Sequence, residues 1–297
     1  MELGMIGLGR MGANMTERLV RGGHKVVAFD RSPEAIERVA GSGALASHSL
    51  ADFVARLQPP RAVWLMVPSG KPVDETIAAL KGSIESGDTV IDGGNSNYKD
   101  TIRRGEDLKA SGVEYIDCGT SGGVWGLKEG YALMIGGARA AVERLTPIFQ
   151  TLAPAADRGW GHVGPSGAGH FVKMIHNGIE YGMMQAYAEG FAVMQRTEAF
   201  HLDLAKIAEN WRYGSVVRSW LLDLIADGLK DNPALTGIKP YVEDSGEGRW
   251  TAFEAIDLNV SAPVITLSLM ERLRSRDADS FADKLLAMMR HEFGGHA

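Results

Sequence analysis

The stretch FVKMIHNGIEYG, residues 171–182, holds side chains that could carry chemistry. Lys173, His176, Asn177 and Glu180 are spaced by three, four and seven residues, which places them on one face of a helix. The opposite stripe is apolar or small and suits packing against other helices. A polar face on an otherwise buried helix predicts a ligand site in a cleft between two domains. The alternative is a solvated helix face, against which the His-Asn pair between glycines argues.

The composition of the chain favours two domains and excludes several classes of partner. Its 297 residues, 45% of them hydrophobic, can bury one large core or two ordinary ones. The net charge of -6 offers no basic field for nucleic acid or for an anionic membrane surface. Cys118 is the single cysteine, which excludes an internal disulfide and a Cys-rich metal site. No apolar run approaches the roughly 18–20 residues of a membrane span, so we expect a cytoplasmic protein. We also expect no metal site.

Strands and helices alternate through the first half of the sequence. Apolar runs occur at ELGMIGLG, HKVVAFD, RAVWLMVPS, DTVIDGGNS and GVEYIDCGTSGG, each followed by a helix-like segment. This alternation predicts an α/β domain of the Rossmann type, a doubly wound sheet with crossover helices. Gly7, Gly9 and Gly12 form G-x-G-x-x-G at the first strand-to-helix turn, with Arg10 and Met11 between them. There the backbone can approach a pyrophosphate that faces a helix N-terminus.

Acidic and polar residues at the strand ends extend this cofactor site. Asp30 ends the second strand 18 residues after the last motif glycine, near the roughly 20-residue spacing expected of the acid that binds the adenosine ribose. Its carboxylate favours NAD over NADP, whereas Arg31 could stack on adenine or neutralise a 2′-phosphate. Val67, Pro68 and Asn95 end later strands at the carboxyl edge of the sheet, where ligands bind. Val67 and Pro68 could equally be ordinary strand-end residues.

A serine and two glycines follow the fifth strand. Gly122 and Gly123 let backbone amides turn towards a carboxylate or a hydroxyl, and Ser121 adds a donor, although a plain turn is the simpler interpretation. After this loop we predict a strand at PAADRGW, a loop at GHVGPSGAG, and helices from about residue 167 onward. The predicted domains are therefore residues 1–165, which bind the dinucleotide, and residues 166–297, which are all-α.

Taken together, these motifs resemble the 6-phosphogluconate dehydrogenase family, in its short form with a single helical domain, within the β-hydroxyacid dehydrogenase superfamily. The match runs along most of the chain, through GLGRMGANM, DGGNSNYKDT, SGG followed by ALMIGG, GHFVKMIHNGIEYGMMQ, GRWTAFEAI and RHEFGGHA. The stretch GHFVKMIHNGIEYG is highly specific. Related 3-hydroxyisobutyrate and tartronate semialdehyde dehydrogenases share the glycine motif, the SGG loop and a helix lysine, but not His-Asn-Gly-Ile-Glu-Tyr as a block.

The resemblance implies a reaction and two catalytic residues. The reaction is the NAD-dependent oxidation of 6-phosphogluconate at carbon 3, followed by loss of CO2 to give ribulose 5-phosphate. Lys173 resembles the general base for the 3-hydroxyl proton, and Glu180 the general acid that protonates the resulting enediol. Both roles need a secluded site, because burial favours a neutral amine and a protonated carboxyl group.

The resemblance also implies the contacts of a phosphorylated sugar acid. Family ligands for its hydroxyls and carboxylate match Asn95, Ser121, Gly122, Gly123, His176 and Asn177, with Asn95 also near the nicotinamide; phosphate contacts match Tyr181, Arg274, Arg290 and His296. In the family the tail residues enter a neighbouring subunit's site, which implies a homodimer or homotetramer built through the helical domain. Without the family, Arg274 belongs to a charge run typical of a solvated helix face, and His296 to a tail that is ordinarily disordered.

The sequence departs from the longer members at two places. Ser245 and Glu247 stand where those enzymes carry a lysine and a threonine for the phosphate, so a cation is lost and a carboxylate gained. Either the phosphate is bound with less help, or the substrate carries less charge. Asp30 replaces the asparagine of the NADP-using enzymes, which supports NAD. Two other functions therefore stay open: a β-hydroxyacid dehydrogenase that oxidises a smaller 3-hydroxy acid without decarboxylation, and a non-catalytic dinucleotide sensor.

Overall fold

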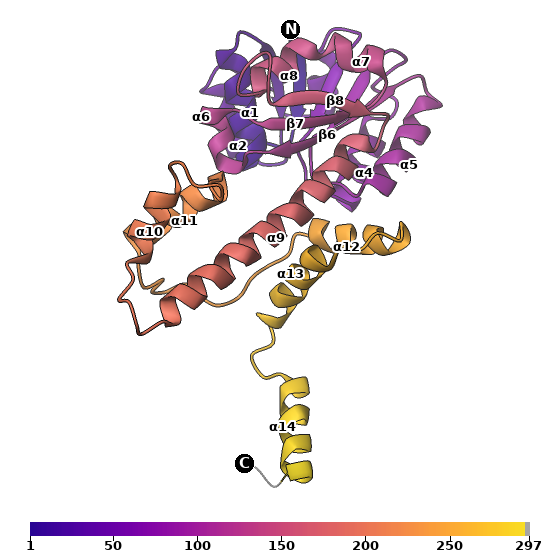
Figure 1. Ribbon diagram of the computed structural model, residues 1–297. Helices are drawn as coiled ribbons and strands as arrows, with labels where there is room; N and C mark the ends of the chain where they lie inside the picture. Colours follow the sequence, from indigo (N-terminus) through magenta and orange to yellow (C-terminus); the bar gives the residue numbers. More distant parts are fainter. Residues whose placement is uncertain (295–297) are drawn as a thin grey trace. The chain divides into compact units, whose positions relative to one another are not determined.

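The computed structural model describes residues 1–294 and divides into two compact units (Figure 1). The first unit runs from Met1 to His176, and the second begins at Asn177. The division falls inside one long helix, α9 (Ala168–Arg196). The predicted domain limits at residues 165 and 166 remain a prediction.

The first unit is built on one eight-stranded sheet. Its spatial order is β3-β2-β1-β4-β5-β6-β7-β8, of which the first six follow the Rossmann order. Strands β1 to β6 pair in parallel, β7 runs antiparallel to β6, and β8 runs parallel to β7. The doubly wound sheet predicted from the alternation is confirmed. The strands are β1 (Glu2–Ile6), β2 (Lys25–Phe29), β3 (Leu45–Ala46), β4 (Ala62–Leu65), β5 (Thr89–Asp92), β6 (Glu114–Ser121), β7 (Ala132–Gly136) and β8 (Trp160–Gly164).

Helices cover both faces of this sheet and close an apolar core on each (Figure 1). Helices α1, α2, α7 and α8 pack on one face, and α3, α4 and α5 on the other. Trp64 and Leu65 enter opposite cores, because successive residues of a strand point to opposite faces. The helices are α1 (Arg10–Arg21), α2 (Pro33–Ala40), α3 (Leu50–Ala55), α4 (Lys71–Leu80), α5 (Tyr98–Lys109), the 3-10 turn η1 (Gly123–Trp125), α6 (Gly126–Glu129), α7 (Arg139–Arg144) and α8 (Thr146–Leu152).

The last strand lies later than predicted. We expected a strand at PAADRGW, but β8 begins at Trp160 and takes up GHVG of the predicted loop. Ala155 and Arg158 form only an isolated bridge. Strand β8 is at the edge of the sheet and has no fully buried residue. An edge strand of this kind has no apolar run to mark it, so pairing with β7 decides its position.

All the regular secondary structure of the second unit's described part, residues 177–294, is helical, which confirms the all-α prediction. A small core forms where Ala208, Leu222 and Ala226 pack against Tyr187 and Phe191 of α9. None of the helices in residues 1–294 could cross a membrane by its length and apolar character. Besides the end of α9, the helices are α10 (Leu204–Trp211), α11 (Trp220–Asp231), α12 (Glu247–Asp257), α13 (Pro263–Arg274) and α14 (Phe281–Gly294).

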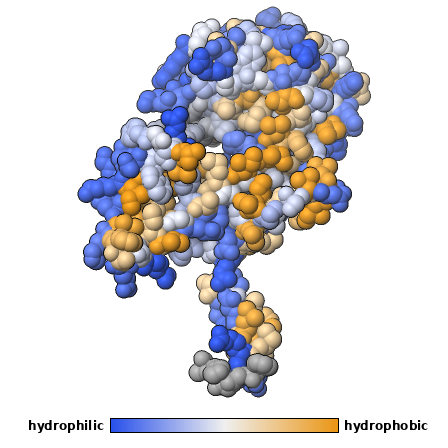
Figure 2. Space-filling view, viewed as in Figure 1, coloured by the Kyte–Doolittle hydropathy of each residue, from blue (hydrophilic) through white to orange (hydrophobic). Residues whose placement is uncertain are grey.

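Helix α14 presents apolar side chains to solvent in the single chain. Phe281, Leu286 and Met288 are 75%, 57% and 53% exposed. Figure 2 shows hydrophobic residues on the visible side of this helix, at the bottom of the view. The apolar side of α14 is thus uncovered in the monomer.

Candidate active site

A buried aspartate fixes the helix that carries Lys173 to the sheet. Asp117 of β6 is fully buried. Its Oδ1 accepts a hydrogen bond from the Gly167 N–H at 2.7 Å, and its Oδ2 accepts one from the His170 N–H at 2.8 Å. The first N–H groups of a helix have no partner within the helix, and a carboxylate there also interacts favourably with the helix dipole. Asp117 therefore anchors the start of α9.

Two glycines let α9 approach the sheet backbone. A Cβ on Gly169 would lie 2.4 Å from the carbonyl oxygen of Met134, and one on Gly119 would lie 2.4 Å from the Cβ of Lys173. Real atoms do not approach so closely, so a side chain at either position would push the helix away. The structure thus places Lys173 against Gly119, two residues before Ser121.

Lys173 is buried, with 6% of its surface exposed. Its Nζ lies 3.5 Å from Nδ1 of His176, at the outer limit of a hydrogen bond. Its role as the general base remains a prediction.

The rest of the polar face continues along the same helix. Asn177 is 8% exposed, and Glu180 is partly exposed. Because α9 is unbroken from Ala168 to Arg196, the helix predicted over these residues is confirmed. Residues four and seven positions after Lys173 therefore share its side of the helix. The substrate contacts assigned to His176 and Asn177 remain predictions.

A buried polar network positions the loop that presents Asn95. Asp92 ends β5 and is fully buried. Its Oδ1 accepts a hydrogen bond from the Gly94 N–H at 3.1 Å, and its Oδ2 accepts one from the Ser96 hydroxyl at 2.7 Å and one from the Tyr115 hydroxyl at 3.0 Å. Burial, and then the neighbouring Asp92 carboxylate, raise the pKa of Tyr115 well above its usual value. The network holds Gly94 and Ser96, so Asn95 is left exposed between two fixed neighbours.

The Ser-Gly-Gly turn requires its glycines. Strand β6 ends at Ser121, and Gly122 and Gly123 follow with φ of 138° and 51°. These angles lie in the region that L side chains avoid. A Cβ on Gly122 would also lie 3.1 Å from the ring of Tyr131. The turn is therefore structural, and its backbone and hydroxyl donors remain predicted substrate contacts.

The first strand-to-helix turn fits a dinucleotide pyrophosphate. Gly7 has φ of 94°, and a Cβ on Gly12 would lie 1.9 Å from the carbonyl oxygen of Gly7. A Cβ on Gly9 would meet nothing within 4 Å, which leaves open space beside the backbone. Helix α1 begins at the exposed Arg10, with no side-chain cap and no acid in its first turn. Its first N–H groups are thus available to an anion.

The acidic end of β2 is fixed beside this turn. Asp30 Oδ2 accepts a hydrogen bond from the Leu8 N–H at 2.5 Å, and its Oδ1 accepts one from the Ser32 N–H at 2.9 Å. Arg31 is 84% exposed and lies 3.7 Å from Glu75. The carboxylate of Asp30 is therefore positioned by the backbone, whereas Arg31 extends into solvent.

The other predicted cofactor residues border the same turn. Val67 and the exposed Pro68 follow β4, and a Cβ on Gly7 would lie 3.0 Å from Cγ1 of Val67. Met11 is partly buried against the core of this face. Their contacts with a cofactor remain predictions.

The structure does not bring all the predicted phosphate contacts of the second unit to one place. Tyr181 is 5% exposed, and its hydroxyl accepts a hydrogen bond from the Ser245 N–H at 3.0 Å. Arg274 has a 69% exposed side chain and lies 3.4 Å from Asp283 of α14. Arg290 is exposed on α14, and His296 lies outside the described residues. Instead, the guanidinium group of Arg272 stacks on the ring of Tyr181. Our sequence analysis did not select Arg272.

Glu247 is buried at the start of α12, with 2% of its surface exposed. Its Oε2 has no hydrogen-bond partner in the described part of the chain. The next residue, Gly248, packs on Tyr181: a Cβ there would lie 2.4 Å from the ring. The first turn of α12 therefore packs against Tyr181, and the Glu247 carboxylate belongs to that turn.

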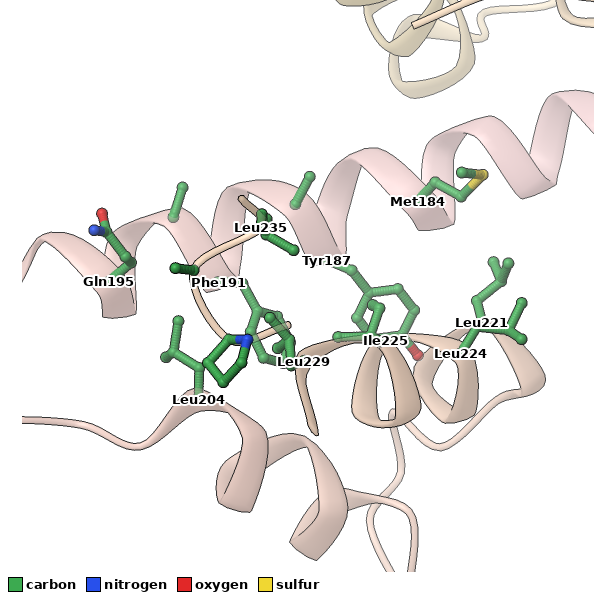
Figure 3. Close-up of a pocket in the computed structure, with 15 residues that line it drawn as sticks. Met184, Tyr187, Phe191, Gln195, Leu204, Leu221, Leu224, Ile225, Leu229 and Leu235 are labelled. Carbon is green, nitrogen blue, oxygen red and sulfur yellow. The ribbon is translucent and has the colours of Figure 1, made fainter. Parts of the chain in front are cut away.

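An apolar cavity of about 700 Å³ in the second unit is a different feature (Figure 3). Tyr187 of α9 points towards Ile225 of α11, and Phe191 of α9 towards Leu229 of α11. No charged side chain lines the cavity, so it cannot pair with a phosphorylated acid. Within residues 1–294 no group of three or more His, Cys, Asp or Glu side chains could hold a metal ion.

Two family models match the chain along nearly its whole length. The NAD binding domain of 6-phosphogluconate dehydrogenase matches residues 2–162, and the 6-phosphogluconate dehydrogenase C-terminal domain matches residues 169–292. The chain belongs to the 6-phosphogluconate dehydrogenase family. The resemblance carried by the sequence motifs is thereby confirmed.

This chain is similar both to family members of its own length and to longer ones. An NAD(+)-dependent, decarboxylating 6-phosphogluconate dehydrogenase of Haloferax volcanii is 44% identical over 297 residues, 100% of this chain and 98% of the relative. One of Bacillus subtilis with the same description is 38% identical over 288 residues, 92% of this chain and 61% of the relative. The fold is also similar to that of Plasmodium falciparum 6-phosphogluconate dehydrogenase, solved in its apo form and with NADP+ or 6-phosphogluconate. The TM-score is 0.86 and the sequence identity 28%, over 99% of this chain and 65% of that chain.

Several positioning residues of this family member escaped the sequence analysis. Asp117 was not among the predicted site residues, and its bonds to the start of α9 join residues 50 and 53 positions apart. Arg38 donates to the Leu8 carbonyl oxygen at 2.6 Å and braces the glycine-rich turn. The one available signal was an acid in an apolar strand, Asp92 at the end of β5 and Asp117 within β6, and nothing local marked Arg38.

Proposed function

We propose that the chain catalyses the NAD-dependent oxidative decarboxylation of 6-phospho-D-gluconate to D-ribulose 5-phosphate and CO2. The observation that supports this proposal is the position of Lys173. Its side chain is buried against Gly119, two residues before the Ser-Gly-Gly turn, and Glu180 follows seven residues later on the same face of α9. The names of the Haloferax and Bacillus relatives support the same reaction.

Residues of the first unit would hold the dinucleotide. Gly7, Gly9 and Gly12 allow the backbone at the N-terminus of α1 to approach the pyrophosphate, and Asp30 would bind the ribose hydroxyls. When bound, the nicotinamide supplies a hydride acceptor for carbon 3 of the substrate.

Lys173 and Glu180 would move the protons of the reaction. Lys173 Nζ takes the proton of the 3-hydroxyl group, so that the oxygen can form a carbonyl as the C–H bond at carbon 3 breaks. The resulting 3-keto acid loses its carboxyl group as CO2, the electron pair left behind is delocalised into the carbonyl group, and Lys173 returns its proton to that oxygen to give an enediol. Glu180 then gives its proton to the carbon that had carried the carboxyl group, which becomes carbon 1 of the ketose, while the enediol hydroxyl on the neighbouring carbon gives its proton back to Lys173.

The rate of reduced-nicotinamide formation tests this function directly. We would measure initial rates with 6-phosphogluconate and with gluconate, each with NAD and with NADP, and trap the released CO2. A fast rate with 6-phosphogluconate and NAD, with equimolar CO2, is the expected result. Reduced cofactor without CO2, or no rate with 6-phosphogluconate, would contradict it.

One observation favours a second candidate function. Glu247 is buried next to the residue that packs on Tyr181, where its negative charge opposes a phosphate. Oxidation of a smaller, uncharged 3-hydroxy acid without decarboxylation would avoid that repulsion. Such substrates are the next to assay if gluconate and 6-phosphogluconate react equally slowly.

Cofactor choice gives a separate prediction. We expect Asp30→Asn to raise the NADP-to-NAD ratio of kcat/KM about tenfold, because it removes a fixed negative charge that repels a 2′-phosphate and about 1.4 kcal/mol corresponds to tenfold. Initial rates with both cofactors give the ratio. Asp157→Asn, at an exposed carboxylate paired with Arg158, is the matched control. An unchanged ratio in Asp30→Asn would show that Asp30 does not determine the cofactor preference.

A further inference from the structure

His170 lies one turn before Lys173 on α9 and contacts two other elements of the first unit. Its backbone N–H donates to Asp117 of β6, and Nδ1 of its ring lies 2.7 Å from Oγ1 of Thr101 on α5. His170 and Thr101 are buried, with 2% and 0% of their surfaces exposed. Residues three positions apart lie on the same face of a helix, so the imidazole ring and the Lys173 side chain move together when α9 turns.

The Thr101 hydroxyl group has two partners. Oγ1 donates to the Asn97 carbonyl oxygen at 3.2 Å, an oxygen that also accepts a hydrogen bond from the Thr101 N–H at 3.1 Å. A hydroxyl group has one hydrogen to donate and can accept as well. In this arrangement the hydroxyl group therefore accepts from Nδ1–H of His170.

Helix α5 follows the loop that presents Asn95. Its N-cap is Asn97, two residues after Asn95, and Thr101 is the fourth residue of the helix. The hydrogen bonds to Asp92 fix the other side of that loop. The contact between His170 and Thr101 thus joins the helix of the proposed base to the element that begins beside Asn95.

The second ring nitrogen of His170 argues against a role in packing alone. Nε2 is buried and has no hydrogen-bond partner in residues 1–294. A buried polar atom without a partner lowers stability, and an apolar side chain of similar size would avoid that loss. The bond made by Nδ1 is what such a side chain could not provide.

The contacts with Asp117 and Thr101 restrain different motions of α9. The N–H groups at the start of a helix point along its axis, so their bonds to Asp117 fix the axial position. The imidazole ring projects away from the axis, so its bond restrains rotation. An atom about 6 Å from the axis moves by about 1 Å when the helix turns by about 10°. A displacement of that size in a reacting group can lower a rate about 100-fold.

We propose that His170 is a positioning residue for the proposed base: its hydrogen bond with Thr101 sets the rotation of α9, and so the position of Lys173 Nζ relative to Asn95. This inference rests on the proposed function. Loss of the bond misplaces Lys173 without removing it, so turnover falls while the fold and the dinucleotide site persist.

Replacing Thr101 by valine and by serine separates the hydrogen bond from packing. Valine keeps the shape and loses the hydroxyl group, whereas serine keeps the hydroxyl group and loses a methyl group. A packing role makes the serine variant the slower of the two, and a hydrogen-bonding role makes the valine variant the slower. Thr16→Val is the matched control, because Thr16 of α1 is buried and its Oγ1 has no hydrogen-bond partner in the described residues.

We expect Thr101→Val to lower kcat for 6-phosphogluconate about 10-fold, because close packing at Gly119 and Gly169 still limits how far α9 can turn. Thr101→Ser and Thr16→Val should stay within about twofold of wild type. The affinity for NADH should be unchanged in all three variants. Initial rates at saturating substrate and fluorescence titration with NADH measure these quantities. A Thr101→Ser variant as slow as Thr101→Val would overturn the inference.

A double-mutant cycle tests whether His170 and Thr101 act through the same bond. His170→Leu removes both ring nitrogens and should lower kcat as much as Thr101→Val. The double variant should be no slower than either single variant, because the bond is already absent. Losses that multiply in the double variant would contradict the proposal.

Chemical labelling of Lys173 tests its position without turnover. Because Lys173 is 6% exposed, an amine-acylating reagent should modify it slowly, and peptide mass spectrometry gives the rate relative to the 81% exposed Lys128. We expect Thr101→Val, but not Thr101→Ser, to raise this relative rate severalfold; unchanged labelling would refute the positioning role. If labelling follows the hydroxyl group but the wild-type protein oxidises no 6-phosphogluconate, the proposed function fails and the positioning of Lys173 is still supported.

Discussion

Lys173→Met is expected to lower kcat for 6-phosphogluconate by about 1,000-fold or more, because it removes the base that takes the 3-hydroxyl proton and a positioned acid or base contributes about 10²–10⁴ in rate. Methionine keeps the length of the side chain and introduces no unpaired charge into a site that is 6% exposed. Initial rates of reduced-nicotinamide formation at saturating substrate measure the loss.

The affinity for the dinucleotide should stay within about threefold in Lys173→Met, because the glycine-rich turn and Asp30 lie on other elements of the first unit. Fluorescence titration with NADH measures this affinity. Lys128→Met, at an 81% exposed lysine of the same unit, is the control and should behave as wild type. Retained turnover in Lys173→Met would remove this lysine from the base role.

Glu180→Gln is expected to lower ketose formation about 100-fold or more, because glutamine cannot donate the proton that the enediol needs. The amide matches the carboxyl group in shape, so the loss reports chemistry and not packing. Parallel assays of reduced cofactor and of ribulose 5-phosphate follow the oxidation and the later protonation separately.

Glu180→Gln also separates the two dehydrogenase functions. Oxidation alone forms no enediol, so a simple β-hydroxyacid dehydrogenase should lose little activity. Glu189→Gln is the matched control, since Glu189 lies on the same helix, is exposed, and accepts a hydrogen bond from Gln185 at 2.8 Å. Equal ketose yields from Glu180→Gln and Glu189→Gln would rule out Glu180 as the acid.

Much of the fold could be predicted because its signals are local. The turn of Gly7, Gly9 and Gly12 is required by backbone geometry within six residues, and the spacing of Lys173 and Glu180 is a property of one helix. Periodicity likewise predicted the parallel strands and the helical second half. The strand at Trp160–Gly164 was misplaced because an edge strand without buried residues has no such pattern.

The candidate site was only partly predictable because its geometry depends on contacts between distant residues. Helix α9 could be predicted from its sequence pattern. The residue that anchors it, Asp117, lies 50 residues before Gly167, the first residue whose N–H donates a hydrogen bond to it. Similarly, Asp92 meets Tyr115 only after β5 and β6 have paired.

The family, the dinucleotide-binding turn and the polar face of α9 could be predicted from the amino-acid sequence, since each depends on residue types at fixed short separations. Three other features depend on tertiary packing: how deeply Lys173 is buried, which carboxylate holds its helix, and that Arg272 rather than Arg274 lies on Tyr181. Burial and ion pairing depend on which elements pack together, and no short-range pattern records that. Two arginines two positions apart are equivalent in a charge run, and only the rotation of α13 about its axis distinguishes them.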